Sequence, residues 1–188
     1  CYPLRSHESK EFFGDLDILV LCNSKSEEDF LKSYVDSYMK YSEMVVNGNV
    51  ISFDYKQLQV DLIITTADNW ESSQFYFDYN DLGNLLGRIA HKLGLKLGHD
   101  GLSHNYRVGT NLVKNIMITK DYREILTIIG YSYADYDDGF NKLEDIFNFV
   151  AGGCFFSKEI FALENRNHVS RVRDAKRKTY MLFLEWLK

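Results

Sequence analysis

The sequence predicts an α+β fold: a mixed or antiparallel sheet with covering helices, a small α/β part and a helical C-terminal extension. Short apolar runs separated by turn residues fill the first 65 positions, and regularly spaced leucines begin after residue 81. Apolar residues towards the C-terminus also recur with helical spacing. A length of 188 residues suits one domain built from two or three small subdomains. We place these at residues 1–74, 75–135 and 136–188.

The first segment has the order strand, helix, strand, strand. Residues 15–23 run apolar and predict a buried strand, after which Ser26 can cap a helix that continues to about Tyr41. The pair Asn47-Gly48 is a strong hairpin signal between two apolar runs. Residues 58–64 predict another buried strand.

The rest of the chain is predicted to be mainly helical. Residues 66–74 are polar and predict a loop, and a strand is expected at 112–118. Helices are expected at 121–129 and 143–150, and a long terminal helix at about 169–187. A further helix begins at Asp81, because apolar residues recur there at helical spacing: Leu82, Leu85, Leu86, Ile89 and Leu93.

Composition limits the classes of protein that fit. The longest apolar run is about five residues, far short of the roughly 20 that a membrane-spanning helix needs. Three scattered cysteines, without paired spacing, predict a reducing intracellular setting rather than a disulfide framework. No signal peptide is visible, although a chain that starts at Cys1 makes this weak evidence. The net charge of −5 does not favour nucleic acid, but net charge can hide an uneven distribution.

Three aspartates carry the strongest chemical signal. Asp15 and Asp17 stand two apart at the start of the first strand, so their carboxylates lie on one face. Asp61 interrupts the apolar run at 58–64, where an unpartnered carboxylate is costly. If the two strands are neighbours, the three acids converge on one end of the sheet. They could then hold two Mg²⁺ ions, for which Mn²⁺ can substitute, for in-line phosphoryl transfer.

The competing interpretation is a turn with solvated acids, which is common for an isolated Asp-x-Asp after glycine. Asp61 by itself is also compatible with an edge strand facing water. The two features together favour the metal site, since two separate acidic interruptions of buried strands would otherwise need separate explanations.

Gly14-Asp15-Leu16-Asp17 together with Asp61 resembles the signature of the polymerase-β-like nucleotidyltransferase superfamily. In that superfamily Gly-Asp-x-Asp lies at the first strand and a third acid lies on a later antiparallel strand. The resemblance implies a nucleotidyltransferase-type sheet in which Asp15 and Asp17 coordinate both metal ions. It also implies that Asp61 binds the catalytic ion and helps to deprotonate the primer 3′-hydroxyl.

A second stretch, residues 76–88, is similar to the nucleotide-binding element of family X DNA polymerases, a Tyr-Phe pair followed by a helix that carries Asp, Asn and Arg. The resemblance implies that Tyr76 and Phe77 flank the sugar and that Asp81 lies against the incoming base. It implies that Asn84 contacts the base or sugar edge and that Arg88 faces the templating strand. An ordinary amphipathic helix is the alternative.

Other stretches extend or limit the likeness. Residues 92–102, 119–125 and 129–133 resemble later family segments, so the likeness covers about 14–133. The family's triphosphate-binding Gly-Ser is missing, which leaves Arg5, Ser6 and Gly14 as candidate nucleotide-binding residues there. Asp78-Tyr79 replaces the family's Thr-Gly, so the choice between dNTP and NTP stays open. The family's amino-terminal lyase helices have no counterpart in this sequence.

The C-terminal extension contains a basic stretch. Residues 164–178 carry a local net charge of +4, which suits contacts to nucleic-acid phosphates. A solvated helix face is an equal alternative. Phe183, Trp186 and Leu187 are expected to dock this segment onto the body. The candidate nucleic-acid-binding residues, with Arg88 on the earlier helix, are Arg171, Arg173, Lys176 and Arg177.

The expected function is addition of nucleotides from a dNTP or NTP to a nucleic-acid 3′ end, with a primer and template as partners and no membrane. The alternative is transfer to a protein, tRNA or small-molecule hydroxyl, or a catalytically silent nucleic-acid-binding relative.

Overall fold

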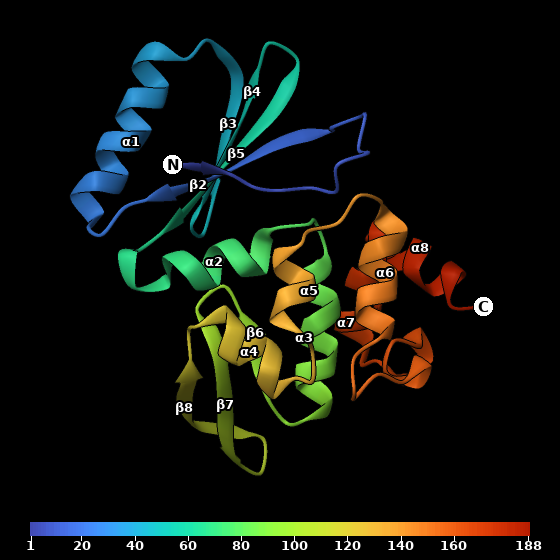
Figure 1. Cartoon of the computed structure of the whole chain (residues 1–188). Coiled ribbons are helices and arrows are strands. Elements are labelled where there is room, and N and C mark those ends of the chain that lie inside the picture. The colour runs from blue at the N-terminus through green and yellow to red at the C-terminus, as the bar shows by residue number, and fades with distance from the viewer.

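The computed structural model describes all 188 residues, and its first half is built on a five-stranded sheet (Figure 1). The strands lie in the order β1-β2-β5-β4-β3, and every neighbouring pair is antiparallel except β2 and β5, which run parallel. The expected mixed sheet of an α+β fold is therefore confirmed. The strands are β1 (Tyr2–Pro3), β2 (Asp15–Leu21), β3 (Tyr41–Asn47), β4 (Val50–Tyr55) and β5 (Leu58–Thr65).

Helix α1 (Lys25–Tyr38) lies beside this sheet (Figure 1). Its N-cap lies two residues before the predicted one, because Ser24 and not Ser26 accepts a hydrogen bond from the backbone of Glu27. The Glu27 carboxylate in turn accepts from the backbone of Asn23, so the helix start is stabilised from both sides.

The second half combines a three-stranded antiparallel sheet with most of the helices. The strands are β6 (Lys96–Gly98), β7 (Gly101–Val108) and β8 (Asn111–Thr119). The α-helices are α2 (Trp70–Phe77), α3 (Leu82–Lys92), α4 (Tyr122–Ile128), α5 (Tyr133–Asp137), α6 (Leu143–Ala151), α7 (His168–Ala175) and α8 (Lys178–Trp186). Short 3₁₀ helices lie at Ala67–Asn69, Lys158–Ile160 and Leu163–Asn165. None of the helices is long and apolar enough to cross a bilayer.

Helix α2 occupies most of the segment predicted to be a loop. Its polar residues misled the prediction because Ser72 and Ser73 are buried, and both hydroxyls donate to the carbonyl oxygen of His99. The Ser73 hydroxyl also lies 2.7 Å from that of Thr65 at the end of β5. Burying these hydroxyls costs little free energy because each has a hydrogen-bond partner. The buried face of α2 can therefore include serines, and its sequence shows no strong apolar pattern.

The predicted terminal helix is interrupted. It forms α7 and α8, with Lys176 and Arg177 between them. Arg177 has an extended backbone conformation, and its guanidinium forms an ion pair with Asp81 at the start of α3. The break therefore has a tertiary cause, since the sequence contains no glycine or proline there. Phe183 and Leu187 are buried as expected.

The apolar core has two parts. A cluster of seven buried residues lies between the five-stranded sheet and α1, and includes Val35, Ile51 and Leu62. A cluster of 23 buried residues extends from Phe75 to Leu187. This larger cluster joins residues on both sides of the boundary predicted at residue 135.

The N-terminal segment connects the two halves. Tyr2 pairs with β2, while its hydroxyl donates to the carboxylate of Asp78 at the end of α2. Arg5 donates to the same carboxylate from its backbone and from its guanidinium, at 2.8 and 2.7 Å. The Arg5 guanidinium also lies over the rings of Tyr79 and Tyr136. We call Tyr2, Arg5 and Asp78 the N-terminal clamp.

Gly83 sets the angle between α2 and α3, and it allows a matched test of that packing. A Cβ at Gly83 would stand 2.1 Å from the carbonyl oxygen of Tyr76, whereas at Gly87 the nearest atom is 3.9 Å away. We expect Gly83→Ala to lower the unfolding free energy by about 1–3 kcal/mol. Gly87→Ala should raise it by up to about 1 kcal/mol, because alanine favours helix. Urea denaturation followed by circular dichroism measures both, and equal effects would contradict the close approach.

Candidate active site

The three predicted aspartates converge at one end of the five-stranded sheet. Asp15 and Asp17 point to one face of β2, and Asp17 stands directly opposite Asp61 on the neighbouring parallel strand β5. One carboxylate oxygen from each residue lies within 4.8 Å of the others. Asp15 is exposed and the other two are half-buried, so the cluster is open to solvent on one side. The resemblance implied that Asp61 lies on an antiparallel strand, but β5 runs parallel to β2 and is antiparallel only to its other neighbour, β4.

The three carboxylates repel one another. Burial, and then the charges of Asp15 and Asp61, raise the pKa of Asp17 to about 6. The side-chain amide of Gln59 donates to both oxygens of Asp61, at 3.0 and 3.1 Å, and holds that carboxylate in place. The donor set consists only of carboxylate oxygens with uncompensated negative charge, which fits a hard divalent cation such as Mg²⁺.

A cavity of about 340 Å³ adjoins two of these aspartates, Asp15 and Asp17. Ser6, Lys10 and Phe77 are among the residues that line it. Lys10 is the only lysine or arginine whose charge lowers the pKa of Asp17, and its ammonium group donates to the side chain of Asn80 at 3.2 Å. The cavity thus has an acidic side for cations and a basic group for the charge of an anionic substrate.

The turn between α2 and α3 forms another wall of this cavity. Tyr79 and Asn80 both have a φ of +59°, a left-handed conformation that is uncommon outside glycine. Buried Tyr79 packs against Phe140, and the exposed Asn80 side chain points to Lys10. Two consecutive residues in this conformation indicate a turn that the surrounding structure constrains beside the candidate site.

The three candidate triphosphate ligands differ in how they relate to this cavity. Arg5 lines the cavity, but its guanidinium is engaged by buried Asp78 in the N-terminal clamp. Gly14 lies in the exposed loop before β2, and a Cβ there would meet nothing within 4 Å. Ser6 lines the cavity without a hydrogen-bond partner for its hydroxyl. Sequence reasoning missed Lys10. The available signal for a substrate-binding cation was a basic residue four positions before Gly14.

The residues of the predicted nucleotide-binding element, which come from the end of α2 and from α3, are divided between two hollows. Phe77 and Asp81 line the cavity beside the aspartates, whereas Tyr76, Asn84 and Arg88 line a separate hollow. Tyr76 and Phe77 therefore do not flank one site together, because consecutive helical residues point about 100° apart.

Asp81 forms an ion pair with Arg177, and Arg88 donates to the carbonyl oxygen of Ile160 at 2.9 Å. The C-terminal extension thus contacts the helix face predicted to meet the base and template.

The basic stretch does not form one surface. Arg173 lines the second hollow, while Arg177 is occupied by Asp81. Arg171 and Lys176 are exposed and line neither hollow. Lys176 follows the end of α7 rather than lying on the apolar side of a continuous helix.

No model of a known protein family matches the chain, and no curated protein matches it. The resemblance to nucleotidyltransferases accordingly depends on the motifs and geometry of the residues described above.

Proposed function

We propose that the protein is a nucleotidyltransferase that transfers a nucleotide from a nucleoside triphosphate to a hydroxyl group, with the 3′ end of a nucleic-acid strand as its acceptor. The observation that carries the proposal is the convergence of Asp15, Asp17 and Asp61 from two adjacent strands. The cavity beside them, with Lys10 on its wall, supports it.

The chemistry follows from the donor set. One or two divalent cations bound there would align the triphosphate with the attacking oxygen and neutralise charge that develops at the phosphorus. Asp15 and Asp17 would hold such ions from one strand. Asp61, whose carboxylate accepts two hydrogen bonds from Gln59, would accept the proton of the attacking hydroxyl. The hydroxyl oxygen would attack the α-phosphorus, the bond to the β-phosphate would break, and pyrophosphate would leave. Lys10 would neutralise charge on the triphosphate and on the leaving pyrophosphate, and Phe77 would pack against the sugar.

The acceptor is the less constrained part of the proposal. Template-directed synthesis, as the resemblance implies, would require Arg88 to leave the carbonyl oxygen of Ile160 and Asp81 to leave Arg177. These two contacts favour addition without a template. Transfer to a protein, tRNA or small-molecule hydroxyl uses the same aspartates and is the alternative outcome.

The test is incubation of the full chain with labelled dNTPs or NTPs, Mg²⁺ and a panel of single strands, primer-templates, tRNA and protein. We expect labelled extension products with the wild type and none with Asp61→Asn. If only a protein or a small molecule becomes labelled, that molecule and not a nucleic-acid 3′ end is the acceptor. Activity that survives in Asp61→Asn would refute the proposed chemistry.

Lys10 allows a narrower prediction. Because a charged hydrogen bond contributes about 1.5–3 kcal/mol, Lys10→Ala should raise the KM for the nucleotide by roughly 10- to 100-fold. The change in kcat should be smaller, since the aspartates are untouched. Lys40→Ala removes an equally charged, exposed residue before β3 and should leave steady-state kinetics unchanged. An unchanged KM in Lys10→Ala would remove Lys10 from the substrate site.

A further inference from the structure

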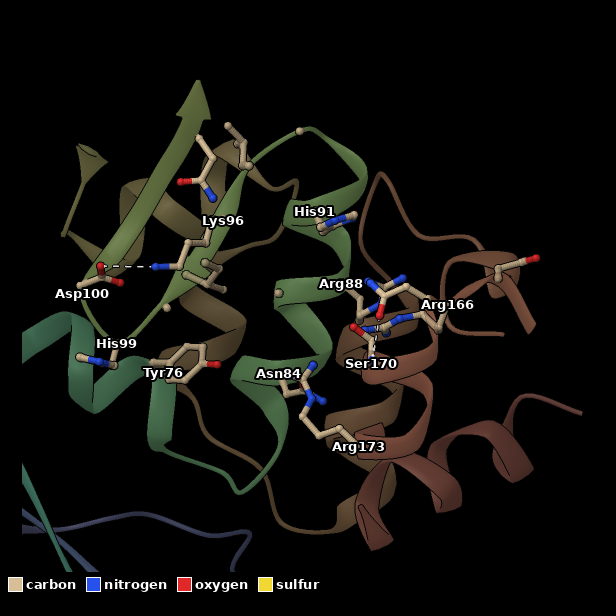
Figure 2. A pocket seen from close by; sticks show the side chains of 18 of the residues that line it. Tyr76, Asn84, Arg88, His91, Lys96, His99, Asp100, Arg166, Ser170 and Arg173 are labelled. Carbon is tan, nitrogen blue, oxygen red and sulfur yellow. Dashed lines mark hydrogen bonds and ion pairs between the residues drawn. The ribbon is translucent and has the colours of Figure 1, made fainter. Parts of the chain in front are cut away.

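The larger hollow of the molecule lies apart from the aspartates, between α3, the β6–β7 hairpin and α7 (Figure 2). Its volume is about 800 Å³, and only three of its 19 lining residues are hydrophobic. Side chains from three separate parts of the chain face this space: Asn84 and Arg88 from α3, Lys96 from the hairpin, and Arg166 and Arg173 from the C-terminal extension. We call it the basic groove.

The groove concentrates positive charge in a protein whose net charge is −5. Five cationic side chains line it: Arg88, Lys96, Arg107, Arg166 and Arg173. Asp100 pairs with Lys96 at 3.7 Å, and Asp174 is shared between Arg166 and Arg173. Neither Arg88 nor Arg107 has an acidic partner. Burial, and then the charge of Arg166, lower the pKa of Arg88.

The groove also contains buried polar atoms without a hydrogen-bond partner. These are Nδ2 of Asn84, Nε of Arg88 and Nδ1 of His99. Buried polar groups are normally paired, so residues that line the groove carry three polar atoms whose hydrogen-bonding capacity the protein itself does not use. Two of the three are N–H donors, which match acceptor oxygens.

Rings in the groove add a second kind of contact. Tyr76 lies on one wall, and His99 stacks on Phe77 with 15° between the ring planes. A cationic groove with aromatic rings and side-chain amides is typical of sites for unpaired nucleic acid, whose bases can stack and whose edges are free. A duplex would offer its phosphates and groove edges but no free base face to stack on a ring.

From these observations we propose that the basic groove binds a single-stranded segment of nucleic acid. Its phosphates contact Arg107 and Arg173, and a base packs against Tyr76 and meets the amide of Asn84. Tyr76 lines the groove and Phe77 lines the aspartate cavity, so the two sites are separated only by the end of α2. That the bound strand is the acceptor whose 3′ end reaches the aspartates rests on the proposed function; the binding itself does not.

The test removes two positive charges of the groove, one on β7 and one on α7. The control removes one positive charge from the opposite face of the hairpin that β7 forms with β8. Arg107→Ala/Arg173→Ala keeps the buried pair of Arg166 with Asp174. Lys114 is the control, because it is exposed on β8 and pairs with Tyr106, so it faces away from Asn105 and Arg107. Binding is measured by fluorescence anisotropy of labelled oligothymidylate and oligouridylate of about 16 nucleotides, between about 50 and 200 mM salt.

All measurements use the Asp61→Asn background with EDTA, so neither metal nor catalysis contributes. The double variant should bind about 10- to 100-fold more weakly, and the slope of log K against log salt should become shallower by about 0.7 for each lost phosphate contact. Lys114→Ala should change neither. Equal binding by the double variant and the control would overturn the proposal, as would AMP or inorganic phosphate that competes as tightly as the strand. Binding in this background, together with no nucleotide transfer by the wild type in Mg²⁺, would overturn the proposed function and leave the groove proposal standing.

Discussion

Asp17→Asn should abolish nucleotide transfer and at the same time stabilise the folded protein in the absence of divalent ions. Transfer should fall by a factor on the order of 10³ or more, because the central carboxylate of the cation site is lost. Stability should rise because a charge held between Asp15 and Asp61 is removed. Discounted for a partly exposed group, the gain is on the order of 1 kcal/mol.

The stability gain should depend on pH in a defined direction. The folded-state pKa of Asp17, about 6, is above the ordinary value of 3.8, so the folded state binds this proton more tightly than the unfolded state. The wild type therefore loses stability as pH rises from about 4 to 6, and the advantage of Asp17→Asn is complete only above that window. Chemical denaturation at a series of pH values in EDTA measures it.

Two controls define the result. Mg²⁺ should raise the melting temperature of the wild type but not of Asp17→Asn. Asp68→Asn, which changes an exposed acid away from the sheet end, should leave activity and pH dependence unchanged. Loss of stability in Asp17→Asn at pH 7.5 would show that the carboxylate is a structural partner instead.

The second large effect is expected at the buried ion pair of Arg166 with Asp174. Their side chains are 4% and 0% exposed, and the two groups lie 2.9 Å apart. Asp174→Ala leaves the guanidinium of Arg166 buried near that of Arg88, so the unfolding free energy should fall by about 3–5 kcal/mol. Urea denaturation at pH 7 gives this value directly.

Two further variants separate the contribution of the pair from that of its surroundings. Arg166→Met should cost less than Asp174→Ala, because Asp174 still receives a hydrogen bond from Arg173 at 3.2 Å. Arg166→Met/Asp174→Leu should be within about 1 kcal/mol of the wild type, since both charges leave the interior together. A loss below about 1 kcal/mol in Asp174→Ala would mean that water reaches Arg166.

The sequence predicted features that are encoded locally. The hairpin around Asn47-Gly48 and helix α3 followed from turn chemistry and apolar spacing. The aspartate cluster followed from two acids placed in apolar strands, once the strands were taken as neighbours. Each of these signals lies within a few residues of the feature that it specifies.

Features that depend on distant contacts were not predicted. Arg5 was expected at a phosphate, but its partner Asp78 lies 73 residues away. The break between α7 and α8 depends on Asp81, 96 residues from Arg177. Strand β7 was missed because its burial does not alternate: the first three residues are buried and four of the remaining five are exposed.

The N-terminal clamp has a consequence for how the molecule unfolds. The small cluster under the first sheet has only seven buried residues, too few to stabilise the folded sheet by itself. Tyr2 and Arg5 link that sheet to Asp78, and the backbones of Glu8 and Ser9 continue the link to Phe140 and Asn141. The first nine residues therefore couple the larger core to the sheet that holds the aspartates. A cut within this segment would weaken that coupling and should convert one thermal transition into two.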